Sequence, residues 1–463
     1  MTLGESGKTV ALASGASQTG FGRTGTVDWQ TGSIKTATFT AANGEGYFCN
    51  TTGGAFTCNL PAGSAGAIVS VQDYNNTFDS NKLTITPNGS EKINGGNGSV
   101  LLGTEGEGAT LVYIDSTVGW RSIQDNAFAD VGSDFIAATG GTITEVGDFR
   151  IHTFTGPGTF TVSKTAVCAP VNKLEYILVA GGGGGGGDDQ STAGGGGGAG
   201  GFRFASPTLA PATYPAKPLA APAAITAAVQ DYPVSVGGGG AGAPGCHASG
   251  PGTVGVNSSV FSLTSAGGGG GTTAGGGSGP SAVGGNGGSG GGAQYYNGPG
   301  KGSGNTPPVS PPQGKDGGVA QGPGTSVYGS GGGGGALAAG EATTPSPGTG
   351  GPGGDGGVGG GFPNAFGTSG ESSSPFYYFS GGGGGGIWTN LPAPVYPGAS
   401  VGAGGLGGGG DAGPKSSPNS SNPGGAATVN TGGGGGGATG GTPARSTGGN
   451  GGSGIVIIRY KFQ

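Results

Sequence analysis

Charged residues are scarce in this chain of 463 residues, at 9% of the total, and the basic ones are scattered. Lys and Arg number 17 against 23 Asp and Glu, which gives a net charge of −6. Binding to nucleic acid requires a basic surface that neutralises phosphates. The composition therefore argues against a nucleic-acid partner.

Long apolar runs are also missing. No stretch approaches the roughly 20 apolar residues of a membrane-spanning helix. The N-terminal stretch MTLGESGKTVALASGASQTG lacks the apolar core of a signal peptide. We expect no membrane insertion and no export by the usual secretory route.

Residues that carry catalysis are few, with two histidines and four cysteines. The cysteine spacings match no zinc or iron–sulfur pattern. His152 lies in a strand pattern, and His247 follows Cys246 in a Pro/Gly-rich stretch, where neighbours in sequence do not form a nucleophile–base pair. GESGKT (4–9) lacks the first glycine of a phosphate-binding loop. We expect no enzyme activity, no cofactor and no metal site.

One cysteine pair leaves two interpretations open. In GYFCNTTGGAFTCNL, Gly53 and Gly54 suit a two-residue hairpin turn, which would place Cys49 opposite Cys58. Their side chains would then be close enough for a disulfide. The alternative is a pair of small buried side chains in a reduced protein, which we favour.

Glycine is what the chain has in excess, with 124 residues. Of these, 97 lie between Gly181 and Gly454, so the chain has two compositional parts. The first part is predicted to be all-β, with a polar segment at 1–40, an antiparallel, sandwich-like β domain at 41–125 and a connector at 126–147. Short runs rich in Val, Ile, Thr, Tyr and Phe, separated by turn residues, carry this prediction. Within 1–40 we expect strands at TVALA and KTATFTA, with a loop at 21–32. The connector is expected to hold one short helix.

The second part, residues 148–463, combines strands with glycine runs. DFRIHTFTGPGTFTV (148–162) predicts two strands around a turn, and LEYILVA (174–180) and GIVIIRYKF (454–462) predict buried strands. We expect these to form a β base from 148–180 and 454–463. YPVSV (232–236) and SSVFSLTSA (258–266) predict further strands, and each leads into a glycine run.

The glycine runs within 181–453 have two interpretations. Glycine-rich segments usually form flexible linkers. Here, however, the runs alternate with proline and aromatic segments, and the region ends in an apolar strand that would otherwise be exposed. We favour packed polyglycine II helices, which have polyproline II geometry and bond to their neighbours through outward-facing backbone groups. A helix surrounded on all sides needs glycine throughout, whereas one at the surface needs it only at some positions. The segments between runs would be loops at the bundle ends.

Aromatic residues between the runs are the candidates for binding. Tyr and Trp offer large contact areas with few rotatable bonds, which suits contact with a receptor or a sugar. The alternative is that they shield the bundle ends from water. The candidate residues are Tyr295, Tyr296, Tyr328, Phe376, Tyr377, Tyr378, Phe379, Trp388 and Tyr396.

Several of these stretches resemble segments of known protein families. HTFTGPGTFTV, LEYILVAGGGGGG and the terminal GGSGIVIIRYKF are similar to the glycine-rich domain found in tail-fibre proteins of marine phages. GYFCNTT, FTCNLPAG, IVSVQDYNNTF, LTITPNG and TLVYIDSTVGW resemble a β module of such fibres, in which the two cysteine positions are usually apolar. Phage adhesins built on a polyglycine bundle, whose loops contact the host receptor, are a further likeness.

The resemblance implies a virion fibre protein without enzyme activity. The N-terminal segment would attach to a phage tail or adaptor protein, and the glycine-rich domain would present loops to a host polysaccharide or outer-membrane protein. Fibres of this class are usually homotrimers. Two alternatives stay open: a purely structural head or neck fibre, and a polysaccharide-degrading tailspike.

Overall fold

The structure is a computed structural model in which two units are distinguished. We call Met1–Phe135 with Ala166–Cys168 the N-terminal unit, and Ile136–Thr165 with Ala169–Gln463 the glycine-rich unit. Regular structure in the described residues is β-strand, with one 3-10 helix, η1 (Lys217–Leu219), and no α-helix. The residues described are 27–96, 98–123, 135–166, 171–188, 192–207, 209, 213–245, 250–273, 283–294, 300–320, 327–343, 351–389, 400–415, 422–440 and 445–463.

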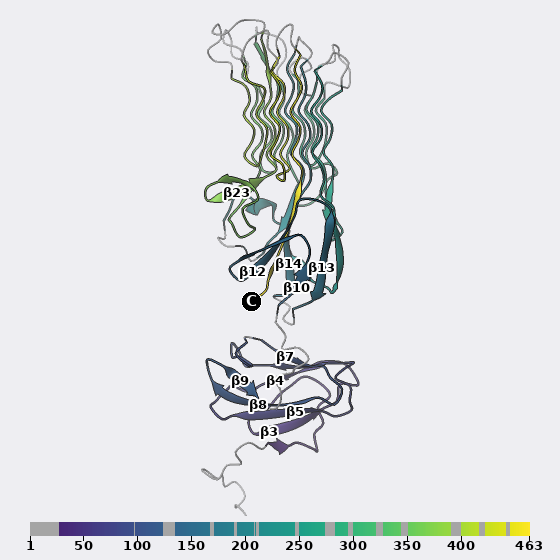
Figure 1. Cartoon of the computed structure of the whole chain (residues 1–463), viewed down its shortest axis with the longest axis vertical. Coiled ribbons are helices and arrows are strands. Elements are labelled where there is room, and N and C mark those ends of the chain that lie inside the picture. The colour runs from purple at the N-terminus through teal and green to yellow at the C-terminus, as the bar shows by residue number, and fades with distance from the viewer. Residues whose placement is uncertain are drawn as a thin grey trace, which may run out of the picture. The chain divides into compact units, whose positions relative to one another are not determined.

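Two sheets form the N-terminal unit and share one core (Figure 1). Buried side chains of both sheets, such as Val71 and Trp120 of the first and Leu83 and Ile85 of the second, belong to this core. The first sheet has the order β1 (Asp28–Trp29), β3 (Glu45–Cys49), β5 (Ile68–Asp73), β8 (Gly108–Asp115) and β9 (Gly119–Ser122). The second has the order β2 (Phe39–Thr40), β4 (Phe56–Asn59), β6 (Leu83–Thr86) and β7 (Val100–Leu102).

The prediction of an antiparallel domain at 41–125 is wrong for four of the seven strand pairs of this unit. β3 pairs in parallel with β1 and β5, and β4 pairs in parallel with β2 and β6; only the pairs β5–β8, β8–β9 and β6–β7 are antiparallel. The reason is that the chain crosses from one sheet to the other after each of the strands from β1 to β5. Successive strands of one sheet therefore run in the same direction. The loop expected at 21–32 also contains β1.

The same crossing removes the expected hairpin around Gly53 and Gly54. β3 and β4 lie in different sheets, so Cys49 and Cys58 are not cross-strand partners. Both cysteines are free and fully buried in the core that the sheets share. Burial raises the pKa of the Cys58 thiol to about 12 and that of Cys49 further still, so neither is a nucleophile at neutral pH.

The glycine-rich unit contains a β base in which the two ends of the glycine region meet. β14 (Lys173–Val179) pairs antiparallel with β25 (Ile455–Lys461). Around them lie β11 (Thr142–Val146), β12 (Phe149–Phe154), β15 (Phe202–Ala205) and β16 (Ile225–Thr226). A separate sheet contains β10 (Ala137–Thr139), β13 (Gly158–Lys164) and β17 (Gln230–Val234).

The strands of 148–162 and 258–266 differ in detail from the expectation. β12 and β13 form as predicted, but in different sheets. The single strand expected at 258–266 is a tight hairpin of β18 (Ser258–Val260) and β19 (Leu263–Ser265). The predicted connector contains β10 and β11 in its described part, while its residues 126–134, like the strand expected at 9–13, lie outside the described residues.

A buried ion pair joins β14 to β25. Arg459 Nη2 and Nε both lie 2.7 Å from Glu175 Oε2, and both side chains are 4% exposed. Ser206 Oγ donates to the same oxygen at 3.0 Å, and the guanidinium lies 3.9 Å from the ring centroid of Phe149. The first and last strands of the region are therefore held in register by a fully desolvated charge pair.

Between β14 and β25 the chain forms extended glycine segments that lie side by side (Figure 1). In the first segment, Gly181–Gly186, successive N–H groups donate in rotation to three neighbouring segments, with a repeat of three residues. The acceptor carbonyls belong, in order, to Val256, Gly452, Gly198, Thr253, Gly449 and Gly195. The carbonyls of Gly181–Gly186 accept in the same rotation from the N–H groups of Gly268, Gly240, Gly435, Gly271, Ala243 and Ala438.

This first segment thus has six neighbours, three through its N–H groups and three through its carbonyls. Glycine is required there because a Cβ would meet backbone on every side: one built on Gly183 would lie 2.2 Å from the carbonyl oxygen of Gly269. Outer segments tolerate other residues at intervals of three. Asp355 and Val358, for example, are exposed while the glycines between them are buried. The glycine runs are therefore packed and hydrogen-bonded, which the linker interpretation does not allow.

Candidate functional site

The predicted aromatic residues fall into three groups in the structure. Tyr295, Tyr296 and Tyr396 lie outside the described residues. Phe376, Tyr377, Tyr378 and Phe379 form a strand, β23 (Phe376–Phe379), and Tyr328 pairs with Trp388. The second and third groups lie at opposite ends of the glycine segment 381–386, because that segment runs from β23 to the strand that contains Trp388.

β23 is part of the β region of the unit rather than a loop (Figure 1). It lies between β21 (Gly360–Phe362) and β22 (Glu371–Ser373) in a three-stranded sheet. Phe379 is buried among Phe202, Phe204 and other rings, and Phe376 packs against the same core. The alternating pattern of a strand places Tyr377 with Phe379 on one face and Phe376 with Tyr378 on the other, and Phe376, Tyr377 and Tyr378 are half-buried. The expectation that this group is a loop is wrong: its residues form a strand at one end of the glycine segment 381–386, and Phe379 of that strand is buried in the core.

Tyr328 and Trp388 lie at the end of the glycine segments opposite to β23. Tyr328 belongs to β20 (Val327–Gly329) and Trp388 to β24 (Ile387–Thr389), which pair antiparallel and place these two residues directly opposite each other. Their rings stack with centroids 5.6 Å apart, and both side chains are half-buried. Stacked aromatic rings on paired strands offer a large contact area with few rotatable bonds, which in general suits contact with sugars and proteins.

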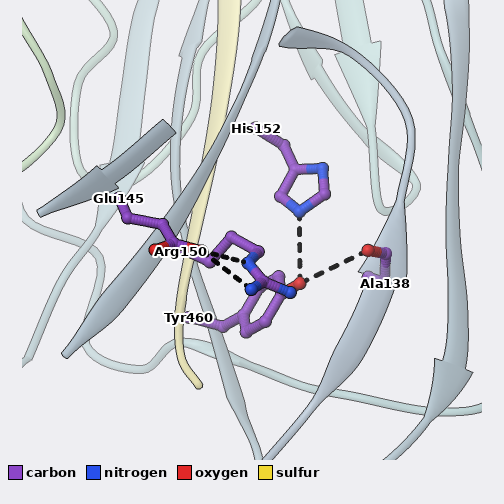
Figure 2. Close-up of polar contacts among 5 residues, drawn as sticks. All are labelled: Ala138, Glu145, Arg150, His152 and Tyr460. Carbon is purple, nitrogen blue, oxygen red and sulfur yellow. Dashed lines mark hydrogen bonds and ion pairs between the residues drawn. The ribbon is translucent and has the colours of Figure 1, made fainter. Parts of the chain in front are cut away.

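A polar cluster in the β base surrounds His152 (Figure 2). The buried His152 Nδ1 lies 2.6 Å from the carbonyl oxygen of Gly140, so this nitrogen carries the proton and donates it. Nε2 then accepts from the hydroxyl of Tyr460 at 3.2 Å, and that hydroxyl lies 3.5 Å from the carbonyl oxygen of Ala138. Both ring nitrogens are occupied, which leaves no position for a substrate and indicates a structural role.

The unfolding free energy of the glycine-rich unit is expected to fall as the pH drops below about 6.5, the ordinary pKa of histidine. Burial lowers the pKa of His152 in the folded protein, so protons bind more strongly to the unfolded chain. This stability is complete above the unfolded pKa and is lost towards the folded pKa, by up to about 1.4 kcal/mol per pH unit. Urea unfolding between pH 5 and 7.5 measures it, with His152→Phe as the control without this dependence. An equal pH dependence in both proteins would contradict the assignment, as would an NMR titration of His152 with a pKa at or above 6.5.

Other kinds of site are missing from the described part of the chain. No group of three or more His, Cys, Asp or Glu is placed to hold a metal ion there. Nor does that part contain a helix with the length and apolarity to cross a membrane. Cys168, Cys246 and His247 lie outside it.

Comparison with known proteins identifies the glycine-rich part. A family model described as "Glycine-rich domain" matches residues 154–461, which is most of the glycine-rich unit and more than half of the chain. No curated protein matches the sequence. The matched residues begin at the end of β12 and include β25, so they contain both ends of the β base and all the glycine segments between them. The chain therefore belongs to the glycine-rich domain family.

Proposed function

We propose that this protein is a non-enzymatic fibre protein of a phage virion that contacts the host surface through its glycine-rich unit. The observation that carries the proposal is the aromatic pair Tyr328–Trp388, held on strands at the end of the glycine segments opposite to β23. Sequence resemblance to tail fibres supplies the biological setting. The N-terminal segment 1–40 attaches to the tail or an adaptor, and the fibre is a homotrimer.

The glycine segments are proposed to be polyglycine II helices. The support is the three-residue rotation of hydrogen bonds along Gly181–Gly186, which is the repeat of polyproline II geometry. Glycine throughout the inner segments and other residues at every third position of outer ones agree with a close-packed array. Such an array is a stiff scaffold that carries its connecting segments at fixed positions, as receptor contact requires.

We propose that the segments connecting the glycine runs contribute to binding together with the aromatic pair. The segments AQYYNGPGKG (293–302) and IWTNLPAPVYPG (387–398), which contain Tyr295, Tyr296 and Tyr396, differ in length and composition from one another, as expected of recognition segments. The receptor is a polysaccharide or outer-membrane protein of the host. Several fibres on one virion gain avidity, so each contact needs only modest affinity.

The purified full chain is expected to compete with virions for adsorption to host cells. Trp388→Ala removes a rigid aromatic anchor and should weaken competition at least about tenfold. Tyr74→Ala, which removes a 53% exposed ring of the N-terminal unit, is the matched control and should compete like the wild type. Failure of the wild type to bind cells or compete would favour a structural head or neck fibre. Release of reducing sugars from the host envelope would instead indicate a tailspike.

A further inference from the structure

A pocket of about 360 Å³ opens in the glycine-rich unit beside β17, away from the predicted aromatic candidates. Its size is at the lower end of the range for small-molecule sites. One wall is β17 with the preceding residues 225–228, and the other is the turn between β18 and β19. The polar and aromatic residues of the lining are Thr226, Gln230, Asp231, Tyr232, Phe261 and Ser262.

The turn that forms one wall has an unfavourable backbone. Phe261 and Ser262 both have positive φ, at 53° and 58°, as a two-residue hairpin turn requires. Asn and Gly normally occupy such positions, and a bulky residue there is a genuine outlier. The chain uses glycine freely elsewhere, so a phenylalanine in this turn indicates that the ring itself is needed.

Both walls are fixed by contacts behind them. The Phe261 ring packs edge-on against Tyr232, with centroids 4.9 Å apart, and also lies near Tyr176 and Phe160. The Tyr232 hydroxyl accepts from the backbone N–H of Ala228 at 3.1 Å, which ties residues 225–228 to β17. The pocket is therefore preorganised rather than a gap between mobile segments.

The polar groups of the pocket suit a neutral, hydroxyl-rich ligand. Asp231 Oδ1 accepts from Thr161 Oγ1 at 2.6 Å, which orients the carboxylate, and within the described residues no donor reaches Oδ2. Gln230 and Ser262 add an amide and a hydroxyl. The one charged lining residue is Asp231, whose carboxylate disfavours an anion, and Lys173 Nζ, outside the lining, donates to the Thr226 hydroxyl at 2.8 Å.

We propose that this pocket binds one neutral sugar residue of a saccharide. An apolar sugar face would pack on the ring of Phe261, and its hydroxyls would donate to Asp231 Oδ2 and exchange hydrogen bonds with Gln230. The alternation of an aromatic surface with a few fixed polar groups is what a pyranose ring, apolar on its faces and polar at its edge, requires. That the bound sugar residue belongs to a host polysaccharide rests on the proposed function, whereas the binding of a neutral sugar does not.

Saturation-transfer NMR on the full chain tests this, with glucose, galactose, mannose and N-acetylglucosamine as neutral probes and glucuronic acid as the acidic one. We expect at least one neutral sugar to bind more tightly than the acid. Asp231→Asn keeps the shape and Phe261→Gly removes the ring while relieving the turn; each should weaken binding at least tenfold. Val254→Ala, at a 53% exposed position elsewhere on the unit, is the control and should bind unchanged.

Three results would overturn the proposal: no neutral sugar binds the folded wild type, the acid binds more tightly, or both pocket variants bind like the wild type. Thermal melting confirms that each variant is folded. Adsorption competition keeps the two proposals separate. Sugar binding that depends on Asp231 in a protein that fails to compete for host cells would support the pocket and contradict the adhesin.

Discussion

Replacing Gly183 by alanine is expected to destabilise the glycine-rich unit by about 3 kcal/mol or more, at the upper end of overpacking in cores. The new Cβ would lie 2.2 Å from the carbonyl oxygen of Gly269, and Gly183 also bonds to Gly198 and Gly435. Relief would require neighbouring segments to move apart, which would break hydrogen bonds that water does not replace. Thermal unfolding followed by circular dichroism measures the loss.

Gly238 provides a matched control within a glycine run. It is exposed, its φ is not in the left-handed region, and a Cβ there would have no atom within 4 Å. Gly238→Ala should therefore melt within about 2 °C of the wild type, since an exposed substitution changes stability by only about 0.5 kcal/mol. If Gly183→Ala were as stable as Gly238→Ala, the close packing of the inner glycine segments would be refuted.

Arg459→Ala is expected to lower the unfolding free energy of the same unit by about 3–5 kcal/mol, because it removes the Arg459 charge from beside the buried Glu175 carboxylate. The loss also removes the contact with the Phe149 ring and the hydrogen bond to the carbonyl oxygen of Ala365. Denaturant unfolding of the full chain measures it.

A variant in which apolar residues replace the charge pair tests whether Arg459→Ala is unstable because of the uncompensated charge or because the polar contacts between β14 and β25 are lost. Glu175→Leu with Ser206→Ala and Arg459→Met replaces the pair and its hydroxyl donor by apolar groups of similar size. We expect it to unfold within about 1 kcal/mol of the wild type, since well-packed apolar residues commonly replace a buried ion pair without loss. A triple variant as unstable as Arg459→Ala would show that the polar network, rather than an uncompensated charge, holds β14 against β25.

The sequence predicted best the features that depend on local composition. LEYILVA and GIVIIRYKF are continuous apolar runs, and their pairing as β14 and β25 follows because both must be buried and both border the glycine region. The packing of the glycine runs was predicted for the same reason: an apolar terminal strand needs an ordered neighbour. Most strands of the N-terminal unit were also located, because short β-branched runs between turn residues are unambiguous.

Pairing between distant strands could not be predicted. Nothing in GYFCNTTGGAFTCNL shows that the chain leaves one sheet after Cys49 and enters the other at Phe56, because a glycine pair serves a hairpin and a crossover equally well. PFYYFS was predicted to be a loop because of its neighbours, while its burial depends on Phe202 and Phe362 far away in sequence. The pocket beside β17 was missed because Phe261 and Ser262 carry no turn signature.

The hydrogen-bonded glycine segments have a consequence for the heat capacity of unfolding. Exposure of apolar surface raises this quantity and exposure of polar surface lowers it, which normally gives about 12–15 cal/mol/K per residue. The inner segments bury peptide groups and almost no side chains, so their unfolding raises the heat capacity little or not at all. A small heat-capacity change flattens the curve of stability against temperature. The glycine segments should therefore lose little stability on cooling, unlike the apolar core of the β base in the same unit.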